Sequence, residues 1–256
     1  MNPGAQDAEV PLYDRFASAY DLMIDWDARL ANEAPFFEWV FSRSDARRVV
    51  DVACGTGRHA AMFASWGLDV VGLDASEAMV EAARRRNPGS RFEVADFLSA
   101  PRAAPGPFDV VFCIGNSLPH LTSPAEVQQA LEGFASMLRP GGALVVQNRN
   151  VDRMYAKGER LLGPSARTAD GVEYVFVRLY DLEPERMRLT IVTLAREADT
   201  WSAAADSTVL IPLFAKSLLP MVERAGFAQV DTYGAYDRQQ YEPASSVDLT
   251  FVATRG

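Results

Sequence analysis

The chain has 256 residues, of which 48% are hydrophobic and 23% charged, so it can build the core of a large α/β domain. Its net charge of −9 argues against a nucleic-acid substrate, because binding to phosphates needs a basic surface. No apolar run reaches the length of about 18 residues that a membrane-spanning helix needs, and Met1 to Gly4 begin no signal peptide. The two cysteines, Cys54 and Cys113, do not form a disulfide framework. We therefore expect a cytoplasmic protein with neither nucleic acid nor membrane as partner.

From the N-terminus, residues 13–20 and 27–41 carry apolar side chains at helical spacing. Strands and helices then alternate, which predicts a parallel sheet with helices on both faces. Ser76 is in place to cap one helix, and the segment Arg139-Pro140-Gly141-Gly142 ends another. The expected strands are 49–52, 70–73, 91–94, 108–114 and 143–147, and the expected helices are 59–66, 77–86 and 124–138.

The pattern changes after Asn150. Three segments, 173–181, 187–197 and 202–211, have the composition of antiparallel strands, with a turn at 183–186. A helix at 214–225 and strands at 227–232 and 247–253 complete the expected elements. We predict an α/β protein with a seven-stranded, mostly parallel sheet. Its expected parts are an N-terminal helical lid (1–45), a sheet domain (46–150 and 212–256) and a small antiparallel insertion that caps the substrate (151–211).

The most informative segment is Val-Val-Asp-Val-Ala-Cys-Gly-Thr-Gly at 49–57. A strand runs into a loop with Gly55 and Gly57, and a helix follows directly. Backbone N–H groups point outward at such a helix N-terminus, which favours a polar ligand. The next strand ends at Asp74, where a carboxylate suits the diol of a ribose.

Two cofactor classes share this arrangement. Dinucleotide enzymes use a third glycine for close helix packing, which the loop lacks, and they bring a pyrophosphate to the helix. The Asp51 carboxylate would repel a pyrophosphate, but it suits an ammonium group or a water molecule beside one. S-adenosylmethionine carries an ammonium, a ribose and an adenine, so we predict this cofactor, with S-adenosylhomocysteine as product. A βαβ turn without any ligand is the alternative.

Together with Val-Gly-Leu-Asp-Ala-Ser at 71–76, this segment resembles motif I of the class I methyltransferases, which have a Rossmann-like fold. Three stretches, 49–57, 113–121 and 148–152, are similar to the glycine N-methyltransferases. The chain departs from that family at Asn148, where a histidine is common, and at Pro119, where a small residue is usual. These departures leave the identity of the methyl acceptor open.

The resemblance implies a role for each matching residue. Arg29 would pair with the methionine carboxylate of the cofactor, and Asp74 would hold the ribose. Asp96 would accept the adenine amino group. The other expected cofactor-binding residues are Asp51, Ala53, Gly55, Gly57, Ala75, Met79, Phe97 and Ile114.

On the acceptor side, the resemblance implies that Asn116 and Arg149 bind the substrate carboxylate and that Tyr20 lies over the substrate. His120 is a candidate base, although a structural role is an alternative for it, as an ion pair is for Arg149. We expect methyl transfer to the nitrogen of a small amino acid or amine. The alternative is N- or O-methylation of a larger small molecule, such as a sugar or natural product. No metal is expected, and a homo-oligomer is left open.

Overall fold

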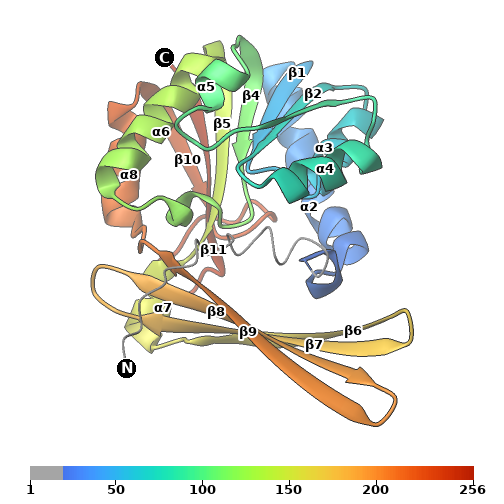
Figure 1. Ribbon diagram of the computed structural model, residues 1–256. Helices are drawn as coiled ribbons and strands as arrows, with labels where there is room; N and C mark the ends of the chain where they lie inside the picture. The colour runs from blue at the N-terminus through green and yellow to red at the C-terminus, as the bar shows by residue number, and fades with distance from the viewer. Residues whose placement is uncertain (1–19) are drawn as a thin grey trace, which may run out of the picture.

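The computed structural model describes residues 20–256, so the expected helix at 13–20 lies almost entirely outside the described residues. The described chain forms two separate sheets (Figure 1). The larger has seven strands in the order β10-β11-β5-β4-β1-β2-β3, and only β11 runs antiparallel to its neighbours. The predicted seven-stranded, mostly parallel sheet is thereby confirmed. Its strands are β1 (Arg48–Val52), β2 (Asp69–Asp74), β3 (Arg91–Val94), β4 (Phe108–Cys113), β5 (Leu138–Arg149), β10 (Phe227–Tyr233) and β11 (Asp248–Arg255).

Helices cover both faces of this sheet, as the alternating pattern predicts. The central strands β1, β4 and β5 are buried almost throughout, because helices exclude water from both sides. One face is covered by α2 (Trp26–Ser44), α3 (Arg58–Ser65) and α4 (Glu77–Arg86), and the other by α5 (Ala100–Ala103), α6 (Pro124–Met137) and α8 (Ala215–Arg224). A short 3₁₀ helix, η1 (Leu118–His120), follows β4. None of the described helices is long and apolar enough to cross a membrane.

Helix α2 falls within the expected lid, but its C-terminal half belongs to the core of the sheet domain. Phe36, Phe37 and Val40 are fully buried there, and the Phe37 ring contacts Phe63 of α3 and Phe112 of β4. Their spacing places the three side chains on one side of the helix, which packs against the sheet. This half of α2 therefore belongs to the sheet domain, and a lid formed by the residues before it stays a prediction.

The second sheet is the predicted antiparallel insertion, with strand order β6-β7-β8-β9. It lies across the end of the parallel sheet at which β5 runs into the short helix α7 (Figure 1). The sequence indicated three of its strands. The missed strand β6 contains Gly163 and Pro164, which are poor strand formers, and pairing with β7 holds it in place. Its strands are β6 (Leu161–Ala169), β7 (Val172–Leu182), β8 (Met187–Glu197) and β9 (Thr200–Leu210), and α7 spans Val151–Lys157.

One boundary in the sheet domain also differs from the prediction. Helix α6 ends at Met137, and β5 begins at Leu138 rather than at residue 143. Leu138 pairs with Phe108 before the register shifts, and Gly141 adopts a positive φ of 72° within this irregular part. The predicted turn at 139–142 is thus an irregularity at the start of a long strand, which pairing with β4 extends.

Candidate functional site

A first cavity, of about 700 Å³ including its open mouth, lies at the carboxyl ends of β1 to β4. This is the edge at which open α/β sheets bind ligands, beside the point where the strand order reverses between β1 and β4. Most of the expected cofactor-binding residues line it. The lining consists of Tyr20, Val52, Ala53, Gly55, Asp74, Ala75, Met79, Ala95, Asp96, Phe97, Gly115, Ser117 and His120.

The loop after β1 fixes the Asp74 carboxylate beside this cavity. Gly55 adopts a positive φ of 54°, which places its N–H 2.8 Å from Asp74 Oδ2, to which it donates a hydrogen bond. The Ser76 N–H donates to Asp74 Oδ1 at 2.9 Å, while the Ser76 hydroxyl caps α4 by accepting from the Met79 N–H. Carboxylate oxygens accept hydrogen bonds, so the arrangement suits a ligand with hydroxyl donors.

The other end of the first cavity combines apolar walls with one carboxylate. Met79, Ala95 and Phe97 supply apolar surface suited to a flat ring. The Ser99 hydroxyl and backbone N–H donate to Asp96, and these hydrogen bonds lower the pKa of the Asp96 carboxyl. The ionised carboxylate can therefore accept from an amino group on a ring that lies against Phe97.

Asp51, on β1, supplies the strongest sign of a cationic ligand. Its side chain is 1% exposed, and neither carboxylate oxygen has a hydrogen-bond partner among the described residues. Burial, followed by repulsion from Asp74, raises the pKa of Asp51 to about 8. A buried carboxyl without a partner is costly, and a ligand ammonium would remove that cost. The donors and acceptors at this end of the sheet thus fit the ammonium, ribose and adenine of S-adenosylmethionine.

Three of the expected cofactor residues border neither cavity: the buried Asp51, Gly57 and Ile114. Gly57 is the N-cap of α3 with a φ of 74°, and a Cβ there would lie 2.8 Å from the Ala83 Cβ. Its lack of a side chain therefore lets α4 pack against the loop. Ile114 is buried in the core beneath the site.

A second, larger cavity of about 1460 Å³ lies between the same sheet edge and the antiparallel insertion. It shares Tyr20, Gly115 and His120 with the first cavity, so the two adjoin at these residues. All four expected catalytic residues line this cavity, and so does Arg29. The four are Tyr20, Asn116, His120 and Arg149.

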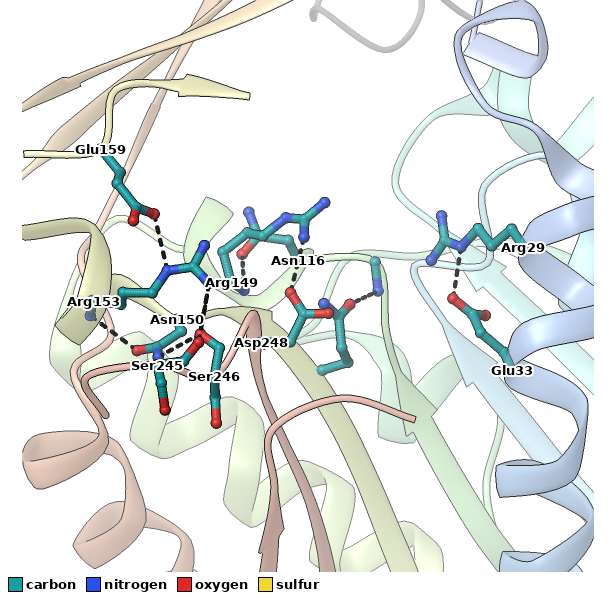
Figure 2. Close-up of polar contacts among 12 residues, drawn as sticks. Arg29, Glu33, Asn116, Arg149, Asn150, Arg153, Glu159, Ser245, Ser246 and Asp248 are labelled. Carbon is teal, nitrogen blue, oxygen red and sulfur yellow. Dashed lines mark hydrogen bonds and ion pairs between the residues drawn. The ribbon is translucent and has the colours of Figure 1, made fainter. Parts of the chain in front are cut away.

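Arg29, on α2, is held by two buried residues that the sequence analysis missed. Its Nε donates to Glu33 Oε1 at 2.9 Å, and His59 Nε2 lies 2.6 Å from Glu33 Oε2 (Figure 2 shows the Arg29–Glu33 pair). Burial alone would raise the pKa of Glu33, but the hydrogen bond from His59 and the charge of Arg29 lower it. Burial lowers the pKa of His59, so the ring is neutral and its Nε2–H donates to the carboxylate. The i, i+4 spacing of Arg29 and Glu33 was a signal for this pair.

Asn116 and Arg149 both lie in the wall of the second cavity. The contact between them joins the Asn116 side chain to the Arg149 backbone. Asn116 Oδ1 accepts from the Arg149 N–H at 2.9 Å, which leaves the amide Nδ2 as a donor. The Arg149 guanidinium forms an ion pair of 3.0 Å with Asp248 of β11 (Figure 2). One edge of the guanidinium is thus already paired inside the protein.

Tyr20 and His120 stand at the junction of the two cavities. Burial raises the pKa of the Tyr20 phenol, and burial lowers the pKa of His120 to about 4. Both side chains are therefore uncharged at neutral pH. They can exchange hydrogen bonds with a substrate without adding a charge.

The neighbouring Asp21 anchors this part of the chain to the loop after β1. Its carboxylate accepts from the Thr56 hydroxyl at 2.7 Å and from Arg58 at 2.9 Å, and it also pairs with Arg86. Sequence reasoning missed this cluster because its members come from three separate segments. The contacts hold Tyr20 close to Gly55.

Comparison with known proteins agrees with this site. Residues 49–142 match the family model of a methyltransferase domain. The chain is 31% identical over 233 residues to a glycine/sarcosine N-methyltransferase of Parasynechococcus marenigrum, covering 89% of this chain and 79% of the relative. It is 29% identical to the glycine/sarcosine N-methyltransferase of Halorhodospira halochloris, with 87% and 81% covered. A sugar N-methyltransferase structure from Streptoalloteichus superposes with a TM-score of 0.72 at 25% identity, covering 100% of this chain and 97% of that one. The chain is therefore an S-adenosylmethionine-dependent methyltransferase and belongs to the family of the glycine/sarcosine N-methyltransferases.

Proposed function

We propose that this enzyme methylates the nitrogen of a small amino acid of the glycine and sarcosine class. The observation that carries the proposal is the junction at Tyr20, Gly115 and His120. There, the cavity that fits the cofactor adjoins one that presents Asn116 and Arg149, an amide and a cation suited to a carboxylate. The activity named for the relatives supports the same acceptor class.

The bound cofactor supplies an electrophilic methyl group on a sulfonium. The protein's main task is then to align the acceptor nitrogen with that methyl group, and good orientation alone contributes roughly 7–11 kcal/mol. Asn116 and Arg149 hold the carboxylate at one end of the acceptor. The amino group is thereby directed toward the junction of the cavities. The insertion, residues 151–211, covers the acceptor from the other side.

The acceptor amine must also lose a proton before it can react. The described lining of the second cavity has four arginines and three carboxylates, and this excess positive charge disfavours an ammonium ion there and lowers the pKa of the bound amine. His120 is neutral and can accept a hydrogen bond from the amine, which orients the nitrogen lone pair. With a pKa of about 4, His120 is too weak a base to carry the proton away by itself.

A second candidate acceptor is the amino group of a sugar. The size of the second cavity favours it, because its volume of about 1460 Å³, which includes the open mouth, leaves room for an acceptor larger than glycine. The sugar N-methyltransferase from Streptoalloteichus also shares the whole architecture. In this case the insertion would contact the sugar ring.

The two proposals separate in an assay of S-adenosylhomocysteine formation with glycine, sarcosine, dimethylglycine, amino sugars and carboxylate-free amines. Under our proposal, glycine or sarcosine gives the highest kcat/KM. A clear preference for amino sugars, with no turnover of glycine or sarcosine, would overturn it.

Arg149→Lys tests the carboxylate anchor. Lysine keeps the charge but loses the planar fork of the guanidinium. We expect kcat/KM for glycine or sarcosine to fall. The decrease should correspond to a loss of about 1.5–3 kcal/mol in transition-state stabilisation, as for a lost charge-assisted hydrogen bond. The affinity for S-adenosylmethionine should stay nearly the same by calorimetry. A variant that treats carboxylate and carboxylate-free acceptors as the parent does would remove Arg149 from this role.

A further inference from the structure

The insertion places an unpaired arginine in the wall of the second cavity. Arg178 lies on β7 and lines this cavity together with Tyr180 of the same strand. Its Nε is buried, and within residues 20–256 the side chain forms no hydrogen bond, ion pair or ring contact. A buried guanidinium nitrogen without an acceptor is costly, so this position calls for a ligand.

The pattern of the strand makes this arginine stand out. Side chains alternate between the two faces of β7, so Phe176, Arg178 and Tyr180 share one face. Phe176 is fully buried, Tyr180 is 3% exposed, and Ile191 is the cross-strand partner of Arg178 on β8. A cation thus occupies a position that packing alone would fill with an apolar side chain.

The charges around the second cavity show what Arg178 lacks. Among the described lining residues, three of the four arginines already pair with the three carboxylates. Arg178 is left as the one unpaired charge, and the wall carries a net positive charge because of it. The pairs are Arg29–Glu33 at 2.9 Å, Arg149–Asp248 at 3.0 Å and Arg167–Asp25 at 3.0 Å.

We propose that Arg178 binds the carboxylate of the acceptor and thereby selects anionic amino acids over neutral amines. This inference rests on the function proposed above and adds to Asn116 and Arg149 a third carboxylate-binding residue, which the insertion supplies. Arg149 shares its charge with Asp248, whereas Arg178 has its whole guanidinium available for a bidentate contact. Burial and repulsion from Arg149 lower the pKa of Arg178, an unfavourable situation that an acceptor carboxylate would relieve.

The test compares Arg178→Met and Arg178→Lys with Arg188→Met as a matched control. Arg188 is an exposed arginine on the neighbouring strand β8, outside the residues that line the cavity. For Arg178→Met, we expect the KM for glycine or sarcosine to rise about 10- to 100-fold. The KM for S-adenosylmethionine and the turnover of ethylamine should change less than about twofold. Arg178→Lys should recover part of the loss, because it restores the charge, and the control should behave as the parent.

Acetate provides a readout that does not depend on turnover. We expect it to inhibit the parent in competition with glycine or sarcosine, and to raise the melting temperature of the parent but not of Arg178→Met. If Arg178→Met does not fold, Arg178→Lys decides the question through the same KM and acetate measurements. Suppose that the parent methylates glycine or sarcosine and that the Arg178 variants keep the KM and the acetate binding of the parent. This result would overturn the role of Arg178 but leave the proposed function standing. A parent that leaves both amino acids unmethylated would instead overturn the proposed function.

Discussion

Glu33→Gln is expected to lower the free energy of unfolding by about 3 kcal/mol and to weaken the binding of S-adenosylmethionine. The Glu33 carboxylate is the buried partner of both Arg29 and His59. Removing one member of a buried ion pair leaves the other charge uncompensated, which typically costs 3–5 kcal/mol. Glutamine keeps the shape of the side chain and some of its hydrogen bonds, so we expect the loss in the free energy of unfolding to lie at the lower end of this range. Arg29 would then be less well fixed, and the expected loss of affinity tests the prediction that Arg29 pairs with the cofactor carboxylate.

The effect should depend on pH in a defined direction. The pKa of Glu33 is lowered in the folded protein, so its stabilisation is present above the ordinary pKa of a glutamate and is lost as the pH falls. The pKa of His59 is lowered by burial, so the folded state also loses stability as the pH falls below the ordinary value of histidine. Between pH 7.5 and pH 5 the titration of His59 should lower the stability of both proteins, whereas below about pH 4.5 the parent alone should also lose the contribution of Glu33, so its stability should fall more steeply there than that of Glu33→Gln.

Urea unfolding at several pH values measures the stability, and calorimetry measures the affinity for S-adenosylmethionine. Glu38→Gln is the matched control, because Glu38 lies on the same helix but is exposed. It should leave both quantities unchanged within about 0.5 kcal/mol. Equal stability and affinity in Glu33→Gln and the control would refute the supporting role of Glu33.

Asp51→Asn is expected to change stability and cofactor binding in opposite directions. At pH 8 we expect the cofactor-free variant to be about 2 kcal/mol more stable than the parent, because the buried carboxyl without a partner is removed. If Asp51 is the counter-charge of the cofactor ammonium, as the sequence predicts, the affinity for S-adenosylmethionine should fall about 10- to 100-fold. A site that is costly when empty and favourable when filled is typical of a ligand-binding position.

The pH dependence follows from the raised pKa of Asp51. Between about pH 4 and pH 8 the folded parent holds a proton on Asp51 that the unfolded chain has released. Because of Asp51, the stability of the parent therefore falls as the pH rises from about 4 to 8. The asparagine variant should not show this decrease. Binding of the cofactor ammonium favours the ionised carboxylate, so the parent should release a proton from Asp51 at pH 7.

Calorimetry in buffers with different ionisation enthalpies measures the proton release, and urea unfolding at pH 5 and pH 8 measures the stability. Asp199→Asn, in the exposed turn between β8 and β9, is the control. If Asp51→Asn binds the cofactor as tightly as the parent and releases as many protons, then Asp51 does not face the ammonium.

The sequence determined the architecture of the sheet domain and most of the first cavity. The reason is that these features depend on short-range patterns. The loop at 53–57 follows a strand and precedes a helix, and Asp74 ends the next strand, so the register of the parallel sheet brings them together. The predicted β8 boundaries match the structure, because its alternation and the preceding turn are local signals.

Tertiary structure alone decided the contacts between distant segments. His59 reaches Glu33 across 26 residues, and Arg149 reaches Asp248 across 99. Arg178 lies in a strand of ordinary alternating composition, and only the position of the insertion at the sheet edge places it in a cavity wall. β6 was missed because its pairing with β7 outweighs its local composition. Spacing in a sequence specifies elements, whereas the partners of a buried charge depend on how those elements pack. That packing leaves Arg178 as the one unpaired cation among the described residues that line the second cavity.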